Sequence, residues 1–144
     1  MMGTSEKYME FAKEVSSLSD DKHTQVGCLI ITLDGKRVKG SNRMPVGCDK
    51  SKDERLERPL KYKWIEHAER DAIYSAARKG ISLEGSTMFL PWFPCVDCAR
   101  AIISSGISKL VCYKPDLENP IWGEDFKISL EVLKEGKVEI EYLK

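Results

Sequence analysis

The chain has 144 residues, of which 42% are hydrophobic and 32% charged, and this composition indicates a single globular domain over residues 1–144. Its 23 basic and 23 acidic side chains give a formal net charge of zero, which argues against a protein that binds long nucleic acid through the phosphates. No apolar run approaches the roughly 20 residues that cross a bilayer, so we expect no transmembrane helix and no membrane partner.

The cysteine content points to a reducing compartment. Residues 1–7 contain no apolar stretch of the kind found in signal peptides, and the five cysteines include the pair Cys95-x-x-Cys98. An odd number of cysteines in a chain without an export signal favours a metal or redox pair over a disulfide framework. We therefore expect a cytoplasmic protein.

Apolar spacing and turn residues predict the secondary structure in chain order. The expected elements are a helix over 4–19, a hairpin of strands 26–32 and 37–40, a helix over 67–79, a strand over 87–90, a helix over 95–105, a strand over 109–113, a helix over 124–135 and a strand over 137–143. Between the hairpin and the second helix, residues 43–65 form a polar insertion, with six basic and four acidic residues within 49–64. Such an insertion is either a solvated surface loop or a functional segment.

Five strands and four helices, alternating after the hairpin, predict one mixed sheet with helices on both faces. The fold class is therefore a three-layer α/β/α domain. Strands 109–113 and 137–143 are joined through a helix, so we expect them to be parallel with a right-handed crossover.

Two short motifs carry the chemistry, namely His67-Ala68-Glu69 and Pro94-Cys95-Val96-Asp97-Cys98. His67, Cys95 and Cys98 are ligands suited to zinc, and three protein ligands with one open position are typical of a catalytic site. The cysteines belong to the first turn of a predicted helix, where the helix dipole favours thiolates. Glu69 would stand beside the metal as an acid/base group, while Cys48 and His23 remain open as a fourth ligand.

These motifs resemble the deoxycytidylate deaminase branch of the cytidine-deaminase-like superfamily. The resemblance rests on residues 67–73 (HAERDAI) and 93–103 (FPCVDCARAII), and more weakly on 26–31 (VGCLII) and 41–43 (SNR). It implies a cytidine-deaminase-like fold, one zinc ion per chain held by His67, Cys95 and Cys98, and hydrolytic deamination at C4 of a cytosine ring. The implied substrate is dCMP, with Glu69 transferring the proton of the attacking water to N3 and then to the departing amine.

The resemblance also implies substrate contacts. Asn42 would bind the sugar or base through hydrogen bonds, and the other candidate contacts are Ala68, Arg43, Trp92 and Phe93. Each aromatic candidate, Tyr113 and Trp122 included, is also compatible with a place in the core. The chain has Ser41 and Arg43 where the family usually has Tyr and Gly, so other residues compete for the phosphate: Lys22, His23, Arg43 or a base within 50–63.

Other functions stay open on the sequence alone. The same chemistry serves cytosine, cytidine, dCTP or guanine, and both motifs also occur in deaminases of adenosine in tRNA. A binding module with structural zinc would need a fourth protein ligand, and a thioredoxin-like redox pair would leave His67-Ala68-Glu69 without a role. The family resemblance further implies a homo-oligomer, and the single cysteine before His67 in the polar insertion predicts no second zinc.

Overall fold

The computed structural model describes residues 3–144; Met1 and Met2, part of the segment searched for a signal peptide, lie outside the described residues. Five strands form one sheet in the order β2-β1-β3-β4-β5. Their bounds are β1 Gly27–Ile31, β2 Arg37–Ser41, β3 Thr87–Phe89, β4 Lys109–Tyr113 and β5 Glu139–Leu143. β1 pairs antiparallel with β2 and β3, whereas β3, β4 and β5 are parallel, so the predicted mixed sheet and its parallel pair are confirmed.

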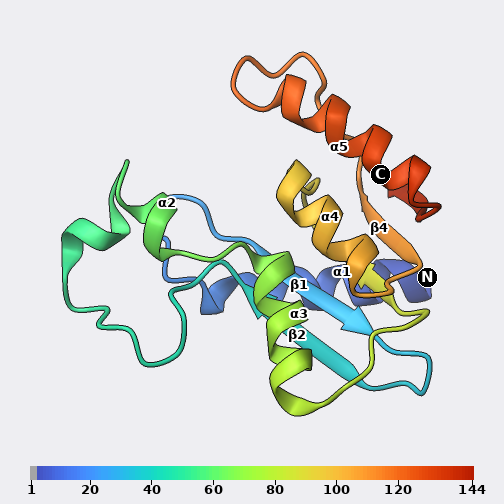
Figure 1. Cartoon of the computed structure of the whole chain (residues 1–144), viewed down its shortest axis with the longest axis horizontal. Helices are drawn as coiled ribbons and strands as arrows, with labels where there is room; N and C mark the ends of the chain where they lie inside the picture. Colours follow the sequence, from blue (N-terminus) through green and yellow to red (C-terminus); the bar gives the residue numbers. More distant parts are fainter. Residues whose placement is uncertain (1–2) are drawn as a thin grey trace.

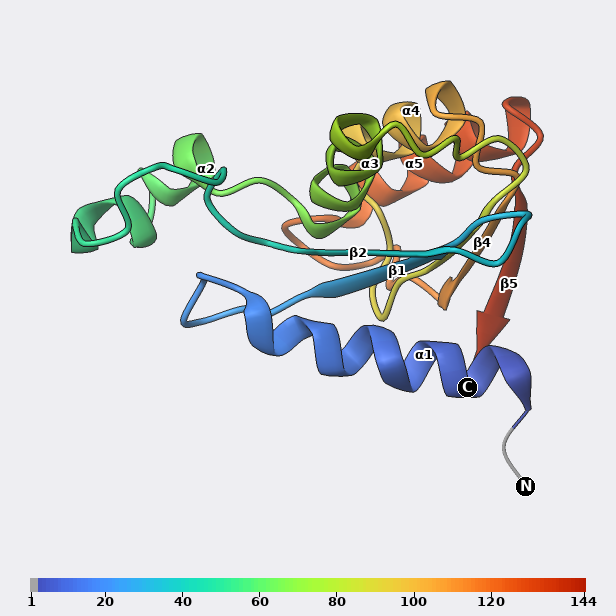
Figure 2. The same cartoon turned by 90° about the horizontal axis from the view of Figure 1, so that it is seen from below.

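Helices cover both faces of this sheet. Helix α1 (Thr4–Val15) packs on one face, and α3 (Ala68–Lys79), α4 (Val96–Ser104) and α5 (Gly123–Glu135) lie on the other (Figures 1 and 2). The predicted three-layer arrangement is therefore confirmed. Within residues 3–144, no helix has the length and apolar character needed to cross a membrane.

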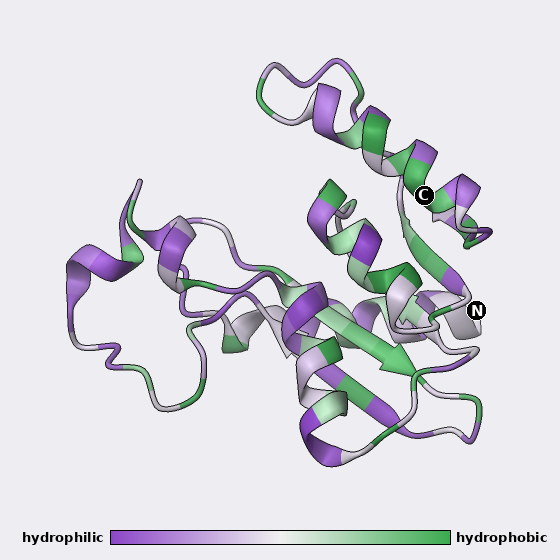
Figure 3. Cartoon of the chain, in the orientation of Figure 1, coloured by the Kyte–Doolittle hydropathy of each residue, from purple (hydrophilic) through white to green (hydrophobic). Residues whose placement is uncertain are grey.

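The polar insertion contains helical turns that were not among the elements expected from the sequence. It contains a 3-10 helix η2 (Asp53–Leu56) and the short helix α2 (Lys61–Trp64), so the described chain has five α-helices instead of four. The insertion extends away from the sheet, and its helices are largely hydrophilic (Figures 1 and 3). A helix of four residues spans about one turn, too little for a periodic apolar pattern to reveal it.

Two element ends differ from the prediction by more than one residue, whereas the other ends agree to within one residue. The first helix becomes a 3-10 turn, η1 (Ser16–Leu18), instead of continuing as an α-helix to residue 19. The last strand begins at Glu139 and not at 137, because Lys137 adopts a left-handed backbone with φ of 62° and belongs to the turn that follows α5.

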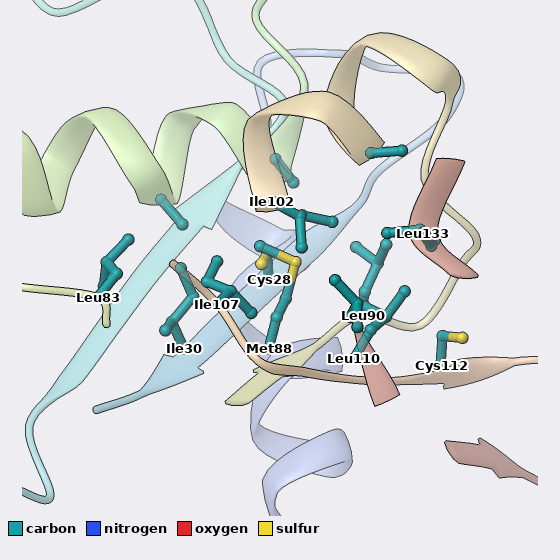
Figure 4. Packing of buried hydrophobic residues seen from close by; sticks show 14 of the residues in the cluster. Cys28, Ile30, Leu83, Met88, Leu90, Ile102, Ile107, Leu110, Cys112 and Leu133 are labelled. Atoms are coloured by element: carbon teal, nitrogen blue, oxygen red, sulfur yellow. The ribbon is translucent and has the colours of Figure 1, made fainter. Parts of the chain in front are cut away.

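The core follows the alternation of side chains along β1. Leu29 packs on the α1 side, whereas Cys28 and Ile30 point to the opposite side, beneath the other helices. Figure 4 shows this larger cluster, which includes Met88, Leu90, Ile102, Leu110 and Leu133. Full burial of each large aliphatic side chain contributes roughly 1.5–3 kcal/mol.

A glycine brings α3 close to the sheet. A Cβ atom added to Gly40 in β2 would collide with the backbone of Ala68 and Ala72 in α3. The missing side chain therefore lets the start of α3 rest directly on β2. This close packing sets the distance between β2 and the start of α3, where His67 and Glu69 lie.

Candidate active site

Three ligand atoms meet at the starts of α3 and α4. His67 Nδ1 lies 3.5 Å from Cys95 Sγ and 3.4 Å from Cys98 Sγ. The three ligand atoms all fall within 4.8 Å of one another. Tetrahedral zinc, with Zn–N near 2.0 Å and Zn–S near 2.3 Å, places its nitrogen and sulfur ligands about 3.5 Å apart. The separations and the donor types therefore fit zinc.

The end of β2 holds the histidine in place. His67 directly precedes α3, and Asp71 in the first turn of that helix accepts hydrogen bonds from the Ser41 backbone N–H and from Arg43 Nε, both at 3.0 Å. These two bonds tie the first turn of α3 to the last residue of β2 and to the segment that follows it. The start of α3, and with it the backbone at His67, is thereby held at the end of β2.

Helix α5 holds the cysteine turn. The Ser129 hydroxyl donates to the Pro94 carbonyl at 2.8 Å, and the Val96 backbone N–H donates to the Asp125 carboxylate at 3.0 Å. Cys95 is the residue between these two anchored positions. Its thiol is consequently presented from a turn that is fixed on both sides.

The electrostatics of the two thiols favour a cation between them. The hydrogen-bonded Cys98 side chain lowers the pKa of Cys95 to about 4 against the opposing effect of burial, and His67 adds to the lowering. The pKa of Cys98 is raised, first by its neighbour Cys95 and then by burial. A second thiolate so close to the first needs a compensating positive charge, which a divalent metal supplies.

Glu69 is the buried acid of the site. Its side chain belongs to a residue that is 4% exposed, and it lines the same cavity as His67 and Cys95. Burial raises the pKa of Glu69, because a carboxylate loses its hydration there. A buried carboxyl group with a raised pKa is suited to accept a proton and to give it up again.

No fourth protein ligand joins the cluster in residues 3–144. The metal-ligating group there consists of His67, Cys95 and Cys98, and the two open candidates are not part of it. His23 instead lies 3.4 Å from the Glu57 carboxylate, and Cys48 is a free cysteine in the polar insertion. The described donor set thus has the three-ligand composition of a catalytic site.

A cavity of about 340 Å³ opens above these residues. Its walls come from the segment before β1, the residue after β2, the polar insertion, the start of α3, the segment between β3 and α4, and the residues that lead into α5. The lining comprises Asp21, Thr24, Val26, Asn42, Arg58, Lys61, Tyr62, Ile65, His67, Ala68, Glu69, Trp92, Phe93, Cys95, Asn119, Ile121, Trp122 and Phe126. This mostly apolar and aromatic wall with a few polar groups is typical of a small-molecule site.

Asn42 stands at the cavity wall with both ends of its amide engaged. Its Oδ1 accepts from the Val26 backbone N–H at 2.8 Å, and its Nδ2 donates to the Thr24 carbonyl at 2.6 Å. The side chain therefore holds the segment that leads into β1. Each end of the amide keeps one further hydrogen-bonding position, so Asn42 can still bind a ligand.

Of the other sequence candidates, Ala68, Trp92 and Phe93 line the cavity. Phe93 is buried and packs edge-to-face on Phe126 with ring centroids 5.6 Å apart, whereas Trp92 is 48% exposed. Arg43 is absent from the lining and pairs with Asp71. Phe93 therefore belongs to the core as well as to the cavity wall, whereas Trp92 is open to solvent and free to contact a ligand.

The sequence did not single out several wall residues. Asp21 and Lys61 form an ion pair at 2.9 Å, with side chains 7% and 5% exposed. Asn119 and Ile121, before α5, also reach the cavity. No local motif marks these positions, because the fold brings them together from segments far apart in the chain.

Comparison with known proteins places these motifs in a wider group. The family model described as the cytidine and deoxycytidylate deaminase zinc-binding region matches residues 2–114. A protein of Aliivibrio fischeri described as an uncharacterized deaminase in the luxG 3' region is 36% identical over 140 residues, which is 95% of this chain and 91% of that protein.

Several relatives carry a named activity, among them a phage protein and a solved phage structure. The deoxycytidylate deaminase of Enterobacteria phage T2 is 46% identical over 77 residues, or 52% of this chain, and the match spans only 41% of the phage protein. The crystal structure of dCMP deaminase from the cyanophage S-TIM5, in complex with dCMP and dUMP, has a TM-score of 0.77 at 25% identity and covers 99% of this chain and 100% of that chain. The predicted fold and the resemblance read from the two motifs are confirmed.

Proposed function

The chain belongs to the family of zinc-binding cytidine and deoxycytidylate deaminases, and we propose that it deaminates dCMP: dCMP and water give dUMP and ammonia. The carrying observation is that the buried Glu69 carboxyl lines one cavity together with His67 and Cys95, which cluster with Cys98 as metal-ligating side chains. The named activities of the phage T2 protein and of the S-TIM5 structure support a deoxycytidylate as the substrate.

The three clustered ligands and Glu69 would have separate roles in this reaction. His67, Cys95 and Cys98 would hold zinc, which when bound supplies a water whose pKa is lowered towards about 7. The water oxygen bonds to C4 of the cytosine ring while Glu69 takes up the released proton and gives it to N3. Glu69 then takes the remaining proton from the hydroxyl on C4 and delivers it to the exocyclic nitrogen, so that the C4–N bond breaks, C4 becomes a carbonyl and ammonia leaves.

The cavity wall would position the ring. Asn42 has one free position on each end of its clamped amide for the sugar or base, and Ala68 with Phe93 offers a closely packed apolar surface for the pyrimidine. Trp92 is exposed enough to close over a bound ring. Arg43 does not enter this assignment, because its guanidinium pairs with Asp71 away from the cavity.

The wider setting is part of the same proposal. We place the reaction in the cytoplasm, where thiol ligands stay reduced. The zero net charge of the chain supports free nucleotides as substrates, and not long nucleic acid.

The chain would act as one domain in a homo-oligomer, and Ile128 and Tyr142 are exposed apolar side chains that an interface could cover. Light scattering on the zinc-loaded protein tests the assembly.

The test of the activity is the release of ammonia from dCMP, deoxycytidine and cytosine by zinc-loaded protein. We expect turnover to be most efficient with dCMP and to fall at least about 100-fold in Glu69→Gln, because that variant loses the proton carrier. The matched control is Glu131→Gln, which removes an exposed carboxylate on α5. Folded, zinc-loaded protein that leaves all three compounds unchanged would refute the proposal.

A further inference from the structure

The cavity wall contains two permanent positive charges among the lining residues, Arg58 and Lys61. Both belong to the polar insertion between β2 and α3. A phosphomonoester carries a charge of about −1.5 to −2 near neutral pH and needs a cationic partner in such a wall. The contacts of the two residues decide which of them is available.

The positive charge of Lys61 is already compensated by a carboxylate of the same chain. Its ammonium lies 2.9 Å from the Asp21 carboxylate, and the two side chains are 5% and 7% exposed. Burial alone would raise the pKa of Asp21, but Lys61 and the backbone N–H groups of His23 and Thr24 overcome that effect and lower it. The carboxylate is therefore charged at neutral pH, and Lys61 serves as an anchor for the insertion.

Arg58 is available. Its side chain is exposed at the cavity wall, and in the part of the chain that the structure describes it forms no ion pair with a carboxylate. A planar guanidinium can bind two phosphate oxygens at once, which an ammonium cannot do.

The backbone around Arg58 is held from both sides. The Glu57 carboxylate lies 3.4 Å from His23 Nε2, and the Glu57 carbonyl accepts a hydrogen bond from the Lys61 backbone N–H at 2.8 Å. Together with the Lys61 anchor, these contacts fix the turn that carries Arg58. Because the backbone of this turn is already ordered, binding a ligand costs little additional conformational entropy, and this favours affinity.

The competing cations lie elsewhere. Lys22 and His23 are not among the lining residues, and His23 faces Glu57. Arg43 also lies outside the lining and pairs with Asp71 at 3.0 Å. Of the bases considered from the sequence, Arg58 alone combines a place in the described wall with an uncompensated charge.

We propose that Arg58 binds the 5′-phosphate of the substrate and makes the site select a nucleoside monophosphate over the nucleoside. This assignment rests on the proposed deamination, because it takes the cavity to be the nucleotide site. It names a specificity-determining residue that acts at the wall and takes no part in proton transfer.

The test compares Arg58→Gln with the wild type in two ways. We expect kcat/KM for dCMP to fall about 10- to 100-fold, the value of a lost charged hydrogen-bond pair, while kcat/KM for deoxycytidine changes by less than about twofold. Calorimetry should show the same loss of affinity for dUMP and none for deoxyuridine. Lys52→Gln, which removes an exposed charge of the insertion outside the cavity, should match the wild type.

Two results would overturn the assignment: equal effects of Arg58→Gln on nucleotide and nucleoside, or a phosphate-specific loss caused by Lys22→Gln and not by Arg58→Gln. The binding arm separates this proposal from the proposed reaction. Arg58-dependent binding of dUMP by a protein that deaminates nothing would refute the reaction alone. Deamination of dCMP that is indifferent to Arg58→Gln would refute the phosphate contact alone.

Discussion

The ammonium of Lys61 lies 2.9 Å from the carboxylate of Asp21, across 40 residues of sequence, and both side chains are almost fully buried. The same carboxylate accepts backbone hydrogen bonds from His23 at 2.9 Å and Thr24 at 3.2 Å. The Thr24 carbonyl in turn accepts from the Asn42 amide at 2.6 Å. One ion pair thereby connects the polar insertion to the clamp at the cavity wall.

Breaking this pair on one side should destabilise the protein strongly. We expect Lys61→Met to lower the free energy of unfolding by about 3–5 kcal/mol, because it leaves the Asp21 carboxylate buried without a partner. Urea unfolding of zinc-loaded protein measures the loss, and the double variant with Asp21→Asn should recover most of it. Lys13→Met, at the exposed pair with Glu10, should cost less than about 1 kcal/mol. Equal losses at the two pairs would contradict the role assigned to Lys61.

The stabilisation by Asp21 should depend on pH with a definite sign. Its pKa in the folded protein lies below the ordinary value of 3.8, so the native state holds the proton less tightly than the unfolded chain. The stability that the charged carboxylate contributes is then present above pH 3.8 and is lost as the pH falls through the lower, folded pKa.

Unfolding of the wild type and of Asp21→Asn in urea over a pH series tests this sign. The difference in unfolding free energy between the two proteins should be full near neutral pH and shrink below about pH 3.8. The metal ligands are the same in both proteins, so their own response to acid cancels in the difference. A gap that widens in acid would show that the carboxylate is not stabilised in its charged form.

Removing one thiol should empty the metal site. We expect one zinc ion per chain in the wild type and a strong loss of zinc in Cys98→Ser, because the buried Cys98 Sγ lies 3.4 Å from His67 Nδ1 within the ligand cluster. Metal analysis after dialysis gives the stoichiometry. Cys48→Ser changes a cysteine outside that cluster and should keep its zinc. Retention of a full ion by Cys98→Ser would mean that the metal binds elsewhere.

The candidate metal ligands and the candidate acid could be recognised in the sequence because each motif is local. His67 and Glu69 are two residues apart, and Cys95 and Cys98 are three apart, so their chemistry is readable before any fold is known. The fold followed from elements long enough to show a period, such as α3 and β4.

The cavity wall could not be predicted in the same way. Arg58 and Lys61 lie in a polar segment with a helix of only four residues, and their places depend on contacts with residues near Asp21. A charged residue in such a segment looks the same in sequence whether it faces solvent or a ligand. Only the tertiary contact distinguishes Arg58 from Lys22 or Arg43.

The close packing of α3 on β2 gives a further prediction. Gly40→Ala would push its methyl group into the backbone of Ala68 and Ala72, so we expect a loss of about 1–3 kcal/mol in unfolding free energy. Because α3 carries Glu69, activity should fall beyond what the unfolded fraction explains. Lys39→Ala, on an exposed neighbour in the same strand, serves as the control in thermal unfolding and turnover assays. A stable, fully active Gly40→Ala would show that α3 can move outward freely.

The most direct test of the proposed reaction is turnover of dCMP in water enriched in ¹⁸O, with mass spectrometry of the nucleotide product. Hydrolysis at C4 predicts dUMP that carries one ¹⁸O atom as the carbonyl oxygen on C4, formed in equal amount with ammonia, and at least about 100-fold slower formation of this product by Glu69→Gln. Recovery of unchanged dCMP from folded, zinc-loaded wild-type protein would contradict the proposed function. Labelled dUMP in equal amount from Glu69→Gln would contradict the role given to its buried carboxyl.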